Sequence, residues 1–355
     1  MAGSHCPSAT TPNLSTDAGG IERSQASASA LTLTLRDLRP FLADPTLTEL
    51  CINRPHECFI ERPDGWHRVE LSFASYDWSL SFAKLIANAT HQRIDEQSPL
   101  LSATLPTGER VQLVLPPATT DHTVAITIRK PSDRTWTLNE LASHGLFQET
   151  HTTSETATPN RLAALLSSGD YESFLRTAVH TRQNILLSGA TGSGKTTLTK
   201  ALIREIPAHE RLVTIEDTRE LDLTTHPNHV RLYYSKDGQG TARITPKQLL
   251  EATLRMKPDR VLLAELRSEE AFYYLRNINS GHPGSITSVH AASAGLAFEQ
   301  LVLLVKESPA AKDLARADIL QLLHRVIDVV VQFELRHGQR VVTEIRYEGF
   351  ATGRE

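Results

Sequence analysis

The sequence has few of the residues that mark secreted or zinc-binding proteins. It contains only three cysteines, Cys6, Cys51 and Cys58, without C-x-x-C spacing and without a histidine pair nearby. A disulfide framework usually needs an even set of cysteines, and a structural zinc module needs closely spaced ligands. We therefore expect reduced thiols in a cytoplasmic protein, and no structural zinc.

Long apolar runs are also missing. The longest, such as residues 301–305 and 329–331, fall far short of the roughly 20 residues that span a bilayer. Residues 1–30 show no basic segment followed by an apolar stretch, so we expect neither a secretory signal nor a transmembrane segment. The same residues are rich in Ser, Thr, Ala and Gly, which favours a disordered tail.

A strong excess of one charge is absent as well. The chain of 355 residues has 37 Lys and Arg against 41 Asp and Glu, which gives a net charge of −4. No global basic field therefore favours nucleic acid as a partner, although a basic patch in a ring pore would escape this sum. Hydrophobic residues at 40% and charged residues at 22% are typical of a globular chain, and the length favours two domains.

A phosphate-binding loop is the clearest motif that is present. Its residues are Gly189, Ala190, Thr191, Gly192, Ser193, Gly194, Lys195 and Thr196, followed by Thr197. They match G-x-x-x-x-G-K-[ST] at every fixed position, after an apolar run and before a helical pattern. Backbone N–H groups in such a loop bind phosphates, so we predict ATP binding at residues 189–197. Lys195 is expected at the β- and γ-phosphates, and the Thr196 hydroxyl on Mg²⁺.

Apolar strands alternate with helical patterns after this loop. We predict an α/β sheet of RecA type, with helices at residues 245–256 and 268–279. The predicted strands are residues 211–217, 261–265, 285–290, 327–335 and 340–347.

Three of these strands end in polar residues beside the predicted phosphate site. Glu216 and Glu265 are suited to holding Mg²⁺ through its waters, and Glu265 could also act as a base or orient water. His290 ends a third strand, where an imidazole could donate to a phosphate oxygen. The residues alone do not distinguish this role of His290 from that of a buried structural histidine.

The first part of the chain has a different pattern. We predict an α+β domain over residues 31–145. Apolar and polar residues alternate at residues 31–35, and the pattern then indicates a short helix at residues 37–42, several strands and a clear helix at residues 76–92. The Thr-rich residues 146–160 are typical of a linker. The ATPase domain is then expected over residues 161–355.

Together these residues resemble the secretion traffic ATPases of type II and type IV systems. The resemblance is closest to the VirB-eleven-like ATPases of type IV secretion. The family's Walker A, Asp box, Walker B and His box correspond to residues 189–196, 215–221, 262–267 and 281–291. The chain lacks the four-cysteine zinc module common in type II assembly ATPases, which favours type IV.

The resemblance implies a homohexameric ATPase at the cytoplasmic face of the inner membrane. Such a motor hydrolyses ATP to power export of DNA or protein, or pilus assembly, with other secretion ATPases and inner-membrane channel components as partners. Glu216 would be the Asp-box acid, Glu265 the Walker B acid and His290 the His-box residue. Arg129 would be an N-domain arginine that touches phosphate. A pilus-retraction or type II secretion ATPase, and a non-hydrolysing scaffold ring, remain alternatives.

Overall fold

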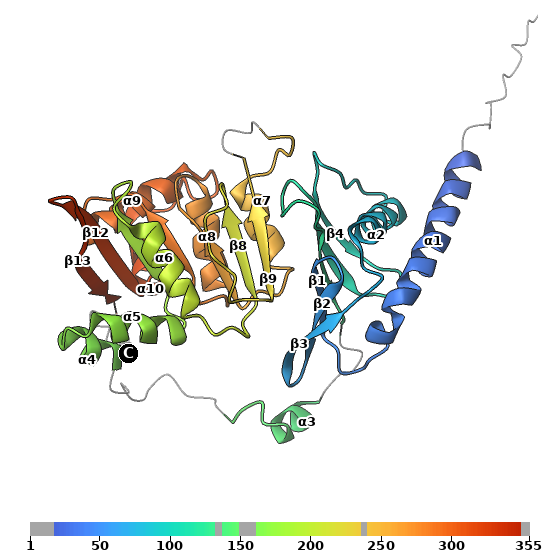
Figure 1. The fold of residues 1–355 in the computed structure, drawn as a ribbon, viewed down its shortest axis with the longest axis horizontal. Helices are drawn as coiled ribbons and strands as arrows, with labels where there is room; N and C mark the ends of the chain where they lie inside the picture. Colours follow the sequence, from blue (N-terminus) through green and yellow to red (C-terminus); the bar gives the residue numbers. More distant parts are fainter. Residues whose placement is uncertain (1–17, 132–136, 149–160, 236–239, 349–355) are drawn as a thin grey trace, which may run out of the picture.

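The computed structural model describes residues 18–131, 137–148, 161–235 and 240–348, and the side chains from residue 30 onward within them. Two bodies are visible in Figure 1, and they contain the earlier and later parts of the chain. Helix α3 (Leu138–Ser143) stands apart from both. The predicted linker, residues 146–160, lies outside the described residues except for residues 146–148.

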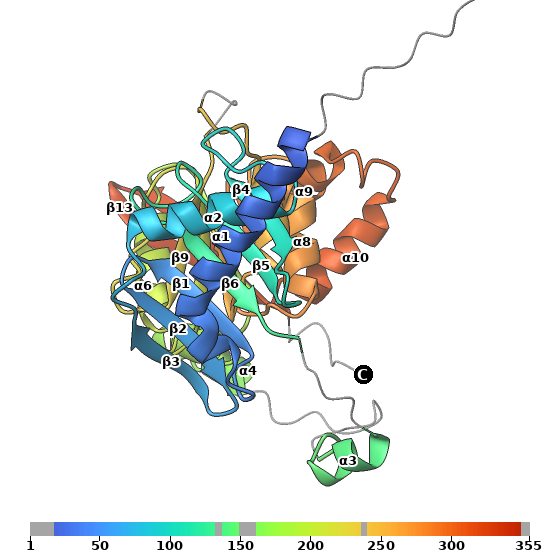
Figure 2. The same ribbon diagram turned by 90° about the vertical axis from the view of Figure 1, so that its right-hand side faces the viewer.

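The first body is a six-stranded antiparallel sheet with two helices on one face (Figure 2). The strand order is β3-β2-β1-β6-β5-β4. The strands are β1 (Glu49–Arg54), β2 (Glu57–Arg62), β3 (Gly65–Glu70), β4 (Leu100–Thr104), β5 (Arg110–Val114) and β6 (Ala125–Arg129). Helix α2 (Tyr76–Ala89) begins where the Ser75 side chain accepts from the Trp78 N–H, and it buries Phe82 and Ile86 against the sheet.

The start of this body differs from the prediction. Residues 18–42 form one helix, α1 (Ala18–Leu42), where a disordered tail, an alternating stretch at residues 31–35 and a short helix at residues 37–42 were predicted. Leu31, Leu35, Leu38 and Leu42 recur at intervals of three or four and pack on the core, which is helical spacing. Alternating threonines between the leucines concealed this period. The part of the predicted tail before residue 18 lies outside the described residues.

The second body is a mostly parallel sheet between helices, and it confirms the predicted RecA-like α/β fold. Its strands form two ladders, β10-β8-β9 and β11-β7-β12-β13. They are β7 (Ile185–Gly189), β8 (Leu212–Glu216), β9 (His229–Tyr233), β10 (Arg260–Leu263), β11 (Ile286–Val289), β12 (Val329–Arg336) and β13 (Gln339–Tyr347). The helices are α4 (Arg161–Ser167), α5 (Tyr171–His180), α6 (Lys195–Arg204), α7 (Pro246–Thr253), α8 (Glu270–Asn279), α9 (Ala294–Glu307) and α10 (Arg316–Val326).

A seam separates the two ladders between β10 and β11. One backbone bond crosses it, from Leu266 N–H to Ser288 O at 2.8 Å. Two serine hydroxyls add to it, since Ser285 donates to Val261 O at 2.6 Å and Ser288 donates to Ala264 O at 3.0 Å. The carboxyl ends of β10 and β11 therefore lie side by side although no continuous ladder joins them.

The two bodies meet at the start of β8. Arg211 is fully buried and donates to Asn53 Oδ1 of β1 at 2.8 Å and to Asn228 Oδ1 at 2.5 Å. Lys257 forms an ion pair with Glu61 of β2 at 2.9 Å. Among the described residues, no helix is both long enough and apolar enough to cross a membrane.

Candidate active site

The predicted phosphate loop has the strand–loop–helix structure that the motif requires. It follows β7 and leads into α6, and Gly189, Gly192 and Gly194 all have positive φ. A Cβ at Gly189 would lie 2.7 Å from Phe333 O, so only glycine fits there. No side chain caps the N-terminus of α6, which leaves its N–H groups available for an anion. The buried Ser193 hydroxyl also lacks a partner.

The loop opens into a cavity of about 350 Å³. Residues 191–197 form one wall. The charged or titratable side chains from other elements are Asp217, Glu220, Glu265, Arg267, His290 and Arg340. This combination of free N–H groups, cations and carboxylates is suited to a polyphosphate with a bound cation.

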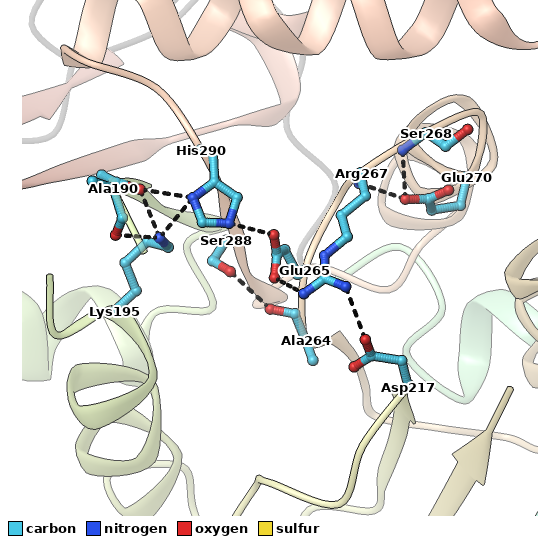
Figure 3. A network of polar contacts seen from close by, with 11 residues as sticks. Ala190, Lys195, Asp217, Ala264, Glu265, Arg267, Ser268, Glu270, Ser288 and His290 are labelled. Carbon is cyan, nitrogen blue, oxygen red and sulfur yellow. Dashed lines mark hydrogen bonds and ion pairs between the residues drawn. The ribbon is translucent and has the colours of Figure 1, made fainter. Parts of the chain in front are cut away.

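A continuous polar network joins the loop to the acids (Figure 3). Lys195 Nζ donates to Gly189 O at 2.6 Å and to Ala190 O at 3.0 Å, and it lies 3.3 Å from His290 Nδ1. On its other side, His290 Nε2 lies 2.7 Å from Glu265 Oε1. This is an ion-pair distance, although the contact does not have standard hydrogen-bond geometry. His290 therefore stands between the loop lysine and the acid.

Arg267 extends the network to a second acid. It donates to Glu265 Oε2 at 2.5 Å and to Asp217 Oδ2 at 2.9 Å (Figure 3). Burial raises the pKa of Glu265. The hydrogen bond and charge of Arg267, together with the charges of His290 and Lys195, lower it by more, so the pKa lies below its ordinary value. Glu265 is thus a carboxylate at neutral pH and can orient a water or accept its proton.

Of the predicted residues, Lys195, Thr196, Glu265 and His290 meet at this cavity, together with loop residues 191–194 and 197. Their proposed roles stay predictions. Sequence reasoning missed Asp217, the residue after Glu216, to which it gave no role. It also missed Arg267 and Arg340 as parts of the site. No motif marks Arg340, whose Nε donates to Gly192 O at 3.1 Å across 148 positions of sequence.

Glu216 does not occupy the predicted position. Its fully buried Oε1 accepts from Thr214 Oγ1 at 2.8 Å and from Arg231 at 3.1 Å, while Oε2 accepts two backbone N–H groups at 2.9 Å. These four donors saturate the carboxylate, so it has no free lone pair for a Mg²⁺-bound water. The role of Glu216 at the metal stays a prediction, and in this arrangement the next residue, Asp217, faces the cavity.

Arg129 does not line the phosphate cavity either. It ends β6, lies 3.6 Å from Glu49 Oε1 and borders a separate hollow of about 580 Å³ with Arg110 and Arg255. The predicted contact of Arg129 with phosphate is therefore not made within one chain.

Mg²⁺ fits the site without a dedicated set of ligands. The described residues contain no group of three or more His, Cys, Asp or Glu side chains that could hold a metal. A P-loop Mg²⁺ takes most of its ligands from phosphates and waters, so it needs little from the protein. The Thr196 hydroxyl, with Asp217 and Glu220 through water, is the donor set that the cavity offers.

A phosphate loop on a parallel sheet, with an acid after β10 and a histidine after β11, defines a P-loop ATPase of RecA-like fold. The family model described as "Type II/IV secretion system protein" matches residues 35–337. The chain belongs to this family and is an ATPase of type IV secretion.

Individual relatives agree. "Type IV secretion system protein VirB11" of Bartonella quintana is 50% identical over 335 residues, which cover 90% of this chain and 94% of the relative. The protein of the same name from Brucella suis is 46% identical over 308 residues, covering 86% and 85%. The crystal structure of the Brucella suis VirB11 ATPase in complex with sulphate has a TM-score of 0.87 and 43% identity, and covers 93% of this chain and 97% of that one.

Proposed function

We propose that this chain forms a homohexameric ring that binds MgATP at the described cavity and couples hydrolysis to the export of DNA or protein, to pilus assembly, or to both. One observation carries the proposal: Glu265 and the loop lysine, Lys195, meet through His290 at a cavity with free helix N–H groups. The names of the relatives support type IV secretion as the setting.

The site residues divide into those that bind phosphate and those that act on water. Lys195 now donates to two loop carbonyls, and it would exchange them for phosphate oxygens, which carry more negative charge. Glu265 is ionised and held by Arg267, so it can fix the orientation of an attacking water. Bound Mg²⁺ would supply positive charge at the β- and γ-phosphates, with Thr196 as its protein ligand.

A ring would complete the site. The cavity is open, and Arg129 borders a different hollow of its own chain, so the contact of Arg129 with phosphate requires the nucleotide of a neighbouring copy. The same proposal places the ring at the cytoplasmic face of the inner membrane, with other secretion ATPases and channel components as partners.

Replacing Lys195 by Ala tests the proposal. We expect loss of ATP turnover, because no other loop side chain supplies its charge to the phosphates. Lys200→Ala, on the same helix but outside the cavity, is the matched control. The mass in solution with MgATP should be that of six chains. Unchanged turnover in Lys195→Ala, or a fully active monomer at micromolar concentration, would contradict the proposal.

Two observations separate the alternatives. A non-hydrolysing scaffold predicts no turnover in the unmodified chain. A pilus-retraction or type II role predicts that pilus proteins co-purify with the ring from membranes, whereas a type IV role predicts channel components.

A further inference from the structure

The C-terminal hairpin flanks the phosphate loop on the side away from the carboxylates. Strand β12 pairs in parallel with β7, in a register that places Phe333 beside Gly189. Strand β13 returns antiparallel to β12 after His337 and Gly338. On the opposite side of β7 lies β11, which leads to His290. The loop therefore stands between β11, which leads to His290, on one side and the hairpin on the other.

Arg340 of this hairpin lies against the loop. Its Nε donates to Gly192 O at 3.1 Å, and its Cδ would lie 3.3 Å from a Cβ built on Gly194. Arg340 lines the same cavity as Lys195 and Glu265. Among the described residues Arg340 forms no ion pair, whereas Arg267 of the same cavity pairs with two acids. The charge of Arg340 is thus available to a ligand.

The positions of the acids orient a nucleotide in the cavity. In P-loop ATPases the loop lysine reaches the β- and γ-phosphates, and the residue that orients water stands beyond the γ-phosphate. Here Glu265 and Asp217 follow β10 and β8, so the γ-phosphate points toward those strands. The α-phosphate and ribose must then leave the loop toward β12 and β13.

We propose that Arg340 binds the α-phosphate and so holds the half of the nucleotide that ATP and ADP share. When the nucleotide binds, the guanidinium donates to a phosphate oxygen, either in place of the Gly192 carbonyl or in addition to it. This inference rests on ATP binding at the cavity. It assigns Arg340 a role distinct from those of Lys195 and Glu265, because affinity for substrate and for product should depend on Arg340 equally.

Calorimetric titration of Arg340→Gln with MgADP, a non-hydrolysed MgATP analogue and magnesium pyrophosphate tests this assignment. We expect the two nucleotides to bind about ten- to a hundredfold more weakly, the range for a lost charge-assisted hydrogen bond. Pyrophosphate, which occupies only the loop, should bind as before. Arg340→Lys should recover part of the affinity.

The controls separate the possible failures. Arg336→Gln, on the same hairpin but ion-paired with Glu334 and outside the cavity, should bind all three ligands normally. Unchanged ADP affinity in Arg340→Gln would overturn the inference alone. An equal loss for pyrophosphate would do the same, because Arg340 would then act only by bracing the loop. Failure of the unmodified chain to bind ADP would overturn the inference together with the proposed function.

Discussion

Separate replacement of Glu216 and Glu265 by Gln should divide stability from catalysis. Glu216→Gln leaves the buried Arg231 with Leu221 O as its remaining strong acceptor, at 2.6 Å, and removes its ion-pair partner. Breaking a buried pair costs about 3–5 kcal/mol, and the retained amide oxygen favours the low end, near 3 kcal/mol. At about 2–4 °C per kcal/mol for a domain of this size, Tm should fall by roughly 6–12 °C.

Glu265→Gln should show the opposite pattern. Its partner Arg267 still forms an ion pair with Asp217, and the side chains of Glu265 and Arg267 both face the cavity. The Tm should therefore change by no more than about 2–4 °C. ATP should still bind, because Lys195 and the loop N–H groups remain. Turnover should fall at least about a hundredfold, the low end for loss of a general base.

Thermal melts, ATP titration and turnover at saturating ATP measure the three quantities on each variant. Each variant is the control for the other, since both changes replace a carboxylate by its isosteric amide at the end of a strand. The reasoning is refuted if Glu216→Gln melts like the unmodified chain while losing turnover, or if Glu265→Gln keeps its turnover.

Two further predictions concern titratable side chains. His290→Ala should keep its Tm and ADP affinity while ATP turnover and secretion fall, because the ring is partly exposed between Lys195 and Glu265; a lower Tm with unchanged activity per folded molecule would instead indicate a structural role. Burial raises the pKa of Glu49 to about 7 against an ordinary 4.5, although Arg129 opposes this. Because the folded pKa is the higher one, Glu49 stabilises the fold while protonated, and this contribution is lost as pH rises through about 7. Glu49→Gln should therefore gain Tm relative to the unmodified chain between pH 5 and pH 8, and an unchanged difference would contradict this.

The sequence predicted those parts of the site that local pattern determines. The loop, the alternation of strands and helices after it, and the placement of Glu265 and His290 all depend on residues close together in the chain, although β9, α9 and α10 were not predicted. Which of the two acids, Glu216 or Asp217, faces the cavity does not depend on local pattern. Adjacent residues at the end of a strand face opposite sides, and β8 is buried on both faces, so its apolar pattern carries no information about which acid faces the cavity.

Other features depend on partners far away in the sequence. Arg340 reaches a loop 148 positions earlier, through the pairing of β12 with β7. The helical period of α1 was visible in four leucines, but the threonines between them gave an equally good alternation. Arg129 was assigned to phosphate from a resemblance, and one chain alone does not contain that contact.

The seam between β10 and β11 places the two halves of the active site on separate ladders of the sheet. Glu265 follows β10, in the ladder of β8, β9 and β10. Lys195 follows β7, in the ladder of β7, β11, β12 and β13. Besides the shared hydrophobic core, two serine hydroxyls, one backbone bond, the Arg260–Gly284 bond and the Glu265–His290 pair join the two ladders. A small rotation between the ladders would change the distance from acid to phosphate without breaking either ladder. Since Arg211 at the start of β8 is bonded to Asn53 of the first body, a displacement of that body would act first on the ladder that carries the acid. A mechanical load on the first body would thereby change the rate of the hydrolytic step.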